Sequence, residues 1–117
     1  MLNVDVDVDV FGRKSRIPEG VRALAVTKVT KLGRRAPVLE HAEVRLTEDD
    51  DAPASRRHMC EVTMAGHGHV VRARARAADL PVAVDLVIEK LEHQVERLKG
   101  KLLARSHPRR SKVLSKA

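Results

Sequence analysis

Hydrophobic and polar residues alternate strictly along the first part of the chain. Between Leu2 and Phe11, valines at every second position (Val4, Val6, Val8 and Val10) are separated by aspartates (Asp5, Asp7 and Asp9). Side chains of a β-strand point alternately to its two faces, so this pattern predicts a strand with one buried and one solvated face. Gly12 is expected to end the strand.

The spacing of apolar residues changes to steps of three and four after Ile17 and Pro18. This spacing predicts a helix whose buried face is formed by Val21, Leu24, Ala25, Val29 and Leu32. Proline is tolerated in the first turn of a helix, and Gly33 is expected to cap the C-terminal end. The basic residues fall on two flanks, with Arg22 on one side of the apolar stripe and Lys28, Lys31 and Arg35 on the other.

Alternation returns between Pro37 and Ala77 and predicts three further strands. They cover about residues 41–46, a stretch from about Arg57 to 64, and residues 69–77. An acidic loop at 48–53 separates the first two of these strands, and Gly66-His67-Gly68 predicts a tight turn before the last. In the last strand the inward residues are Val71, Ala73 and Ala75, and the outward residues are Arg72, Arg74 and Arg76.

The longest periodic stretch, from Asp79 to Leu103, predicts a second amphipathic helix with Asp79 as its cap and Pro81 in its first turn. Its apolar stripe consists of Val84, Val87, Ile88, Leu91, Val95, Leu98 and Leu102. Charges of opposite sign separate to the two sides of this stripe. Lys90, His93, Arg97 and Lys101 fall on one flank, whereas Glu89, Glu92 and Glu96 fall on the other.

These elements follow the order β-α-β-β-β-α. A strand–helix–strand connection makes the first two strands parallel, and the remaining strands form antiparallel hairpins. Because each strand has one apolar face, both helices must cover the same face of the sheet. We therefore expect an α+β domain over residues 1–104, a two-layer sandwich with a four-stranded mixed sheet and two helices packed on one face. The basic flanks of the helices are expected to merge into one surface, and residues 105–117 to form a basic tail or the start of a linker, disordered unless a partner orders it.

Composition narrows the kind of partner. The chain has a formal charge of +7 and a single aromatic residue, Phe11. The charge favours a polyanionic partner, nucleic acid before an acidic membrane surface. Proteins that bind single strands stack bases on exposed aromatic rings, so we expect this chain to contact phosphates and shape on structured RNA instead. No apolar run approaches the ~20 residues that span a bilayer, so we expect a cytoplasmic protein with no membrane partner.

Candidate catalytic chemistry is sparse. The aspartate row of the first strand could hold a metal, but equal spacing on an outward strand face is more typical of a solvated edge. His67 and His69 could supply two metal ligands, although Cys60 offers no paired thiolate and is expected to be a buried structural thiol. The sequence contains no glycine-rich phosphate loop and no nucleophile elbow. We therefore expect no enzyme, no cofactor, no metal and no small-molecule substrate, with a metal-dependent hydrolase at the aspartate row as a remote alternative.

Two helical stretches resemble a known family. The first is IPEGVRALAVTKVTKL, whose end fits Lys-x-x-Lys-Leu through Lys28, Lys31 and Leu32. The second is VAVDLVIEKLEHQVERLKGK, which fits Asp-x-x-x-(Asp/Glu)-Lys-Leu through Asp85, Glu89, Lys90 and Leu91. With the order of elements, they make about residues 3–105 similar to the ribosome hibernation-promoting factors, also called ribosome-associated inhibitors or sigma-54 modulation proteins.

The resemblance implies a domain that binds ribosomal RNA of the small ribosomal subunit in the channel for messenger and transfer RNA, blocks translation, and preserves idle ribosomes in stress and stationary phase. By matching position it assigns RNA contacts to Arg22, Lys28, Lys31, Lys90, Arg97, Lys99 and Lys101; Arg35 joins this RNA-binding set because it shares a flank with Lys28 and Lys31. His93 stands where relatives often have arginine. Long members carry a C-terminal domain that pairs two ribosomes, and we expect that dimerisation domain to be missing from this chain.

A second interpretation remains open beside the ribosomal one. The outward arginines of the last strand, Arg72, Arg74 and Arg76, could contact a protein instead of RNA. The chain would then be a protein-interaction module, for example a regulator of the transcription machinery.

Overall fold

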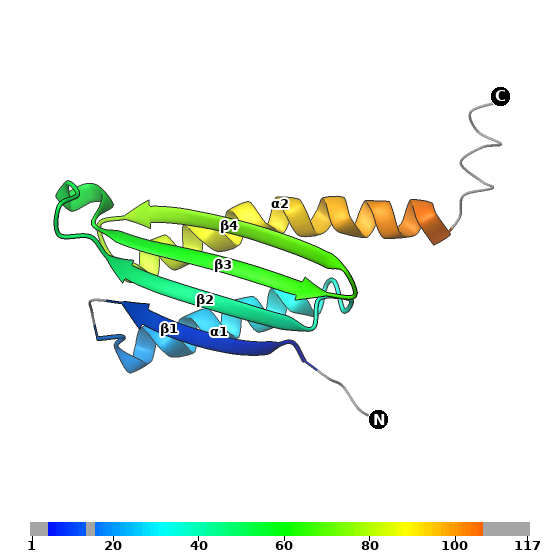
Figure 1. Cartoon of the computed structure of the whole chain (residues 1–117), viewed down its shortest axis with the longest axis horizontal. Helices are drawn as coiled ribbons and strands as arrows, with labels where there is room; N and C mark the ends of the chain where they lie inside the picture. The colour runs from blue at the N-terminus through cyan, green and yellow to red at the C-terminus, as the bar shows by residue number, and fades with distance from the viewer. Residues whose placement is uncertain (1–4, 14–15, 107–117) are drawn as a thin grey trace.

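The computed structural model describes residues 5–13 and 16–106 of the chain. Its elements, shown in Figure 1, are β1 (Asp7–Arg13), α1 (Glu19–Gly33), β2 (His41–Glu48), the short 3₁₀ helix η1 (Ala54–Arg56), β3 (His58–Gly66), β4 (His69–Ala77) and α2 (Leu80–Ser106). The expected order β-α-β-β-β-α is confirmed. The connection between β2 and β3 contains η1, directly after the predicted acidic loop at 48–53, and the sequence pattern did not predict this short helix.

The strands form one four-stranded mixed sheet in the order β1-β2-β3-β4. β1 is parallel to β2, as the strand–helix–strand connection requires, and the other neighbours are antiparallel. The predicted tight turn joins β3 to β4 through His67 and Gly68, whose φ angles are 49° and 80°. Positive φ at both central residues is typical of the hairpin turn that matches the twist of a sheet. The ring of His67 lies against Glu40, with 3.0 Å between Nε2 and Oε2.

Both helices cover the same face of the sheet and lie beside each other (Figure 1). The layer between helices and sheet is filled by aliphatic and sulfur-containing side chains, and the largest fully buried ones include Leu39, Leu46, Met64 and Leu91. Within the described ranges this buried layer contains no polar or charged residue. Phe11 lies outside it, 45% exposed, with the guanidinium of Arg45 5.4 Å from its ring centre. The two-layer α+β sandwich expected from the sequence is confirmed.

Several element limits differ from their predictions. β1 runs from Asp7 to Arg13, so Gly12 lies within the strand, in register with Leu46, and does not end it. The predicted start of this strand at residues 2–4 lies outside the described residues. α2 continues to Ser106, beyond the predicted domain limit at 104. Of the predicted tail at 105–117, Arg105 and Ser106 belong to α2, and residues 107–117 lie outside the described residues. Neither helix of the described chain combines the length and the apolar character that a bilayer span requires.

The helix starts follow from identifiable caps. Pro18 is the N-cap residue of α1 and not part of its first turn, with the extended angles φ −60° and ψ 144°. Asp79 caps α2 as predicted, because its Oδ1 accepts a hydrogen bond of 3.0 Å from the backbone N–H of Val82.

Gly33 has a packing role, and the prediction that it caps the C-terminal end of α1 is wrong. It is the last residue of α1, and Arg34 follows in the right-handed helical conformation (φ −66°, ψ −21°). A Cβ atom at position 33 would lie 2.8 Å from Cγ1 of Val6. The missing side chain therefore lets the end of α1 approach the segment that leads into β1.

Cys60 is fully buried on the helix-covered face of β3. Burial raises the pKa of this thiol to about 12, with a smaller contribution from the carboxylate of Glu61. The thiol is therefore protonated at neutral pH, and the prediction of a buried structural cysteine is confirmed.

Replacing Gly33 by alanine should destabilise the fold by about 1–3 kcal/mol, because the new methyl group overpacks against Val6. Gly100→Ala in α2 is the matched control. Nothing lies within 4 Å of a Cβ at position 100, so helix propensity predicts a gain of about 0.5–1 kcal/mol. Urea unfolding followed by circular dichroism measures both changes; a Gly33→Ala variant as stable as the parent would contradict the packing role.

The folded chain should react with a thiol reagent such as DTNB at pH 7–8 at least a hundred-fold more slowly than the urea-unfolded chain. The cause is that the thiolate is the reactive form, and both burial and the raised pKa suppress it. Absorbance of the released thionitrobenzoate gives the two rates. Similar rates in the folded and unfolded chain would show that Cys60 is accessible.

Candidate nucleic-acid interface

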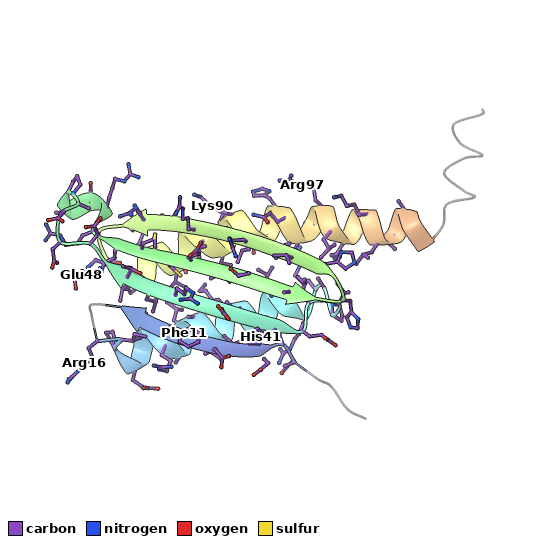
Figure 2. The ribbon with its side chains drawn as sticks, viewed as in Figure 1. Phe11, Arg16, His41, Glu48, Lys90 and Arg97 are labelled. Carbon is purple, nitrogen blue, oxygen red and sulfur yellow. The ribbon has the colours of Figure 1, made fainter. Side chains whose placement is uncertain are left out.

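The cationic flank of α2 lies along the edge strand β4. Figure 2 shows Lys90 and Arg97 along the upper edge of the view, where α2 runs past β4. The ammonium group of Lys90 donates a hydrogen bond of 2.9 Å to the backbone carbonyl of Arg74. Arg97 and Lys101 follow at steps of whole helical turns and are exposed like Lys90. Three of the predicted RNA-binding residues therefore share one exposed flank.

Gln94 ties this flank to the sheet, and sequence reasoning missed it. Its Nε2 donates a hydrogen bond of 2.6 Å to the backbone carbonyl of Arg72, and its Oε1 accepts one of 3.1 Å from the backbone N–H of the same residue. An edge strand leaves N–H and C=O groups unpaired, and the amide of Gln94 satisfies one of each. The sequence signal that could have identified Gln94 was its position, a single glutamine one helical turn after Lys90 within a row of cationic residues.

A groove lies where α2 passes the turn between β3 and β4. Its volume is about 330 Å³. Val71 and Leu98 line it together with the cationic side chains of Arg97 and Lys101. Two of the cations are thus held beside an open hollow at the end of the sheet.

The basic flank of α1 faces the acidic flank of α2. The ammonium of Lys28 lies 3.3 Å from Oδ1 of Asp85. The guanidinium of Arg35 pairs with both Glu92 and Glu96, at 4.0 Å for Glu92. These contacts place opposite charges between the two helices.

The expectation that the basic flanks of both helices merge into one surface is therefore wrong. A helix has two flanks beside its buried stripe, and α2 turns the acidic one toward α1 and the basic one toward β4. Lys99 lies on the acidic side, with its ammonium 4.0 Å from Oε2 of Glu96. Of the predicted set, Lys28, Arg35 and Lys99 have carboxylate partners, whereas Lys90, Arg97 and Lys101 have none among residues 5–13 and 16–106.

The remaining members of the predicted set stand apart from both groups. Lys31 is exposed and lines a groove of about 580 Å³ between the helices, next to Leu24 and Ile88. Arg22 is partly buried on the other flank of α1.

Arg34, which is outside the predicted set and follows α1, donates hydrogen bonds of 2.9 and 3.1 Å to Asp5 and thereby lowers the pKa of that carboxyl group.

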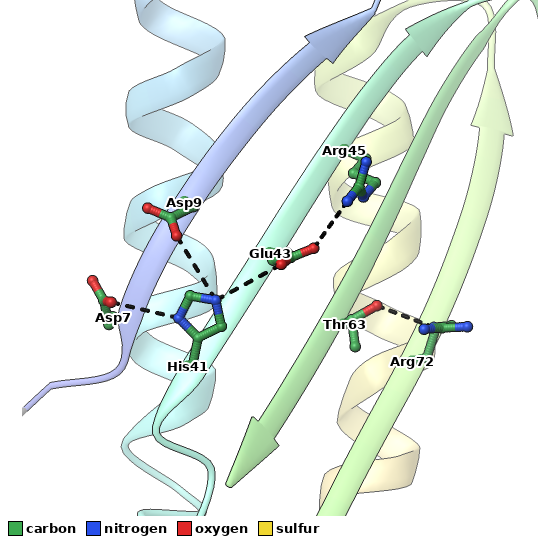
Figure 3. Close-up of polar contacts among 7 residues, drawn as sticks. All are labelled: Asp7, Asp9, His41, Glu43, Arg45, Thr63 and Arg72. Atoms are coloured by element: carbon green, nitrogen blue, oxygen red, sulfur yellow. Dashed lines mark hydrogen bonds and ion pairs between the residues drawn. The ribbon is translucent and has the colours of Figure 1, made fainter.

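The arginines of β4 differ in their contacts. Arg76 has an acidic partner, with its Nη1 3.6 Å from Oδ2 of Asp49. Arg72 donates a hydrogen bond of 3.1 Å to the hydroxyl of Thr63 on the neighbouring strand (Figure 3). Arg74 is in register with Glu61 of β3, but the two side chains form no ion pair within 4.0 Å. Two of the three arginines are therefore not neutralised by a described neighbour.

An acidic cluster occupies the outer face of the sheet at β1 and β2. Figure 3 shows the imidazole of His41 between carboxylates: Nδ1 lies 3.5 Å from Asp7, and Nε2 lies 3.7 Å from Asp9 and 4.0 Å from Glu43. The ligand atoms of Asp7, Asp9 and His41 lie within 4.8 Å of one another, the one such group in the described chain. These residues could ligate a metal, and without one they form a solvated polar cluster. His41 was missed because only the strand register brings it beside the aspartates.

Comparison with known proteins agrees with this architecture. A family described as "Sigma 54 modulation protein / S30EA ribosomal protein" matches residues 8–103. The "Ribosome hibernation promotion factor" of Deinococcus radiodurans is 29% identical over 92 residues, which are 79% of this chain and 48% of that protein. The Protein Y N-terminal domain of Thermus thermophilus, a crystal structure, matches with a TM-score of 0.63 and 27% identity over 80% of this chain and 98% of that chain.

A further likeness concerns the fold alone. A ribosomal subunit interface protein from Coxiella burnetii matches with a TM-score of 0.67 at 19% identity, over 81% of this chain and 99% of that chain. The two-layer β-α-β-β-β-α domain is thus a known architecture. Because the family match spans most of the sequence, the chain belongs to the sigma-54 modulation protein / S30EA ribosomal protein family. It spans about half the length of the Deinococcus relative.

Removing the acidic charges between the helices should strengthen binding to structured RNA. In the Glu92→Gln/Glu96→Gln variant, Arg35 and Lys99 lose their carboxylate partners, and repulsion between carboxylates and phosphates falls. We expect the dissociation constant for an RNA duplex at 0.15 M salt to fall by about 3- to 10-fold, the size typical of surface charge changes. Fluorescence anisotropy measures the affinity.

The matched control is Asp50→Asn/Asp51→Asn, which changes the net charge equally in the exposed loop after β2. It should move the dissociation constant by less than about 2-fold, because charges beyond the Debye length of roughly 8 Å are screened. Equal effects of the two variants would show that net charge, and not the position between the helices, controls binding.

Proposed function

We propose that this chain binds the small ribosomal subunit in the channel that messenger RNA and transfer RNAs use, and that it contacts ribosomal RNA through basic residues of its helices. It thereby inhibits translation and preserves idle ribosomes, as in stress or stationary phase. The observation that carries the proposal is the exposed row of Lys90, Arg97 and Lys101 on α2, which lacks carboxylate partners in the described chain. Family membership supports it, as does the name of the Deinococcus relative, a ribosome hibernation promotion factor.

The spacing of the row suits a phosphate backbone. With a rise of 1.5 Å per residue, Lys90 and Arg97 are about 10 Å apart along the helix axis, and Arg97 and Lys101 about 6 Å. Cations at such intervals can each meet a different phosphate of one strand. Neutralising phosphates releases counterions, which supplies most of the affinity of a protein that reads no bases.

Base stacking has little part in this mode of binding. The single aromatic residue, Phe11, lies on the outer face of the sheet under the guanidinium of Arg45. It is far from the row on α2, since β2 and β3 separate β1 from β4. Contacts to phosphates and to the shape of folded RNA are therefore the mode that the side chains support.

The proposed action is occupation of a channel. A folded domain lodged there excludes messenger and transfer RNA by volume, so no bond is made or broken and no catalytic residue or cofactor is required. The action takes place in the cytoplasm, where ribosomes translate. Pairing of two ribosomes, which belongs to a separate domain of long family members, is not part of the role proposed for this chain.

The triple variant Lys90→Glu/Arg97→Glu/Lys101→Glu tests the proposal. Loss of three phosphate contacts at 0.15 M salt should weaken binding to purified small subunits by roughly 100-fold or more, because each contact contributes about 4- to 5-fold through counterion release. Co-sedimentation with small subunits across a salt series measures the affinity, and circular dichroism checks that the fold persists.

The matched control reverses three exposed arginines away from the row, Arg16→Glu/Arg45→Glu/Arg56→Glu, and should retain most of the binding. Added transfer RNA should compete with the parent chain if the binding site is the channel. Undiminished co-sedimentation of the triple variant at 0.15 M salt, or binding insensitive to transfer RNA, would contradict the proposal.

A further inference from the structure

The outer face of the sheet is electrically divided. Its β1–β2 half carries Asp7, Asp9 and Glu43 around His41, with Arg45 paired to Glu43 (Figure 3). Its β4 edge carries Arg72, Arg74 and Arg76. The division is not apparent along the sequence, because the acidic half combines residues from two strands that are far apart in the chain. A polyanion that approaches this face is attracted at one edge and repelled at the other.

The positive edge continues without a break from β4 onto α2. Lys90 donates its hydrogen bond to the carbonyl of Arg74, and Gln94 bonds the backbone of Arg72 on both its N–H and its C=O. Arg72, Arg74 and Lys90 line an open hollow of about 540 Å³ between the strand and the helix, and Glu61 of β3 also lines it, without an ion pair to any of the three. Strand and helix thus present their cations to the same space.

These cations share a second property, which separates them from the cations between the helices. Lys28, Arg35 and Lys99 are paired with carboxylates. No ion pair within 4.0 Å joins a described carboxylate to any member of the group that we name the β4–α2 edge: Arg72, Arg74, Lys90, Arg97 and Lys101. Cations without a carboxylate partner bind phosphate without first breaking an ion pair, so this edge is a part of the surface that is ready for a polyanion.

We propose that Arg72 and Arg74 of β4 extend the cationic row of α2, so that the β4–α2 edge binds the phosphodiester backbone of one RNA segment. This inference rests on the proposed function and adds two residues, from a strand, to a surface otherwise formed by helices. The acidic half of the sheet limits the contact to this edge. RNA is favoured over an acidic protein because the five cations follow a strand and the helix beside it, a linear arrangement that suits a regularly charged backbone.

The test uses the full chain and neutral substitutions. The variant Arg72→Gln/Arg74→Gln removes two positive charges, and the matched control Arg16→Gln/Arg45→Gln removes two from positions away from the edge. Binding to purified small subunits and to protein-free small-subunit ribosomal RNA is measured over a salt series. Thermal unfolding checks that both variants are folded, because Arg72 also bonds Thr63.

For the edge variant we expect the dissociation constant at 0.15 M salt to rise on the order of 20-fold for both probes. The slope of log affinity against log salt should fall by about 1.4–1.8, that is 0.7–0.9 for each lost phosphate contact. The control should change affinity by less than about 2-fold, because Arg45 is paired with Glu43 and Arg16 precedes α1, so neither belongs to the β4–α2 edge.

The other outcomes separate this inference from the proposed function. A parent chain that does not bind small subunits would overturn both. A parent chain that binds, with an edge variant that binds equally well at the same salt slope, would overturn only the role of Arg72 and Arg74. An edge variant that is weakened on whole subunits but unchanged on protein-free RNA would show that the arginines contact a protein, and this too would overturn the inference.

Discussion

The packing of α2 across the sheet is the constraint on which the rest of the structure depends. Val87, Leu91 and Val95 are completely buried against the strands, and Val84 is nearly so. Burying each such side chain stabilises the fold by about 1.5–3 kcal/mol, so the helix has one strongly preferred rotation about its axis. That rotation decides where every charged residue of α2 points.

Once the rotation is fixed, the two flanks of the helix acquire different environments. The acidic flank faces α1 and pairs with Lys28 and Arg35. Exposed ion pairs of this kind contribute only about 0–1 kcal/mol each, so they do not hold the helices together. Their larger effect is on the charge distribution, since they pair Lys28 and Arg35 with carboxylates, whereas Lys90, Arg97 and Lys101 beside β4 have no carboxylate partner in the described chain.

The edge of the sheet and the charged surface are parts of one arrangement. β4 is an edge strand, and such strands invite unwanted pairing with other chains. Here α2 covers that edge, with Gln94 and Lys90 bonded to backbone groups of β4. The same contacts bring the cations of helix and strand together, so protection of the edge also builds the positive surface.

Local patterns predicted most of the fold, because alternation and helical spacing depend on neighbouring residues. The order of elements, the parallel pairing of β1 with β2 and the cap at Asp79 follow from such patterns. The role of Gly33 could not be predicted, since its reason is Val6, a residue distant in sequence. The prediction that the basic flanks merge was wrong for a similar reason. The helical periodicity of α2 defines two flanks beside its apolar stripe, but it does not show which flank faces α1. The roles of Gln94 and His41 could not be predicted either, because their contacts are to residues that only tertiary packing brings close.

The central claim is that RNA meets this domain at the exposed cations of α2 and the adjoining edge of β4. The most direct measurement is a single-particle structure of the chain bound to the small ribosomal subunit. The account predicts that the ammonium and guanidinium groups of Lys90, Arg97 and Lys101 lie within charge-assisted hydrogen-bond distance, about 2.7–2.9 Å, of phosphate oxygens. A complex in which these groups face solvent while the acidic cluster around His41 faces the RNA would contradict it.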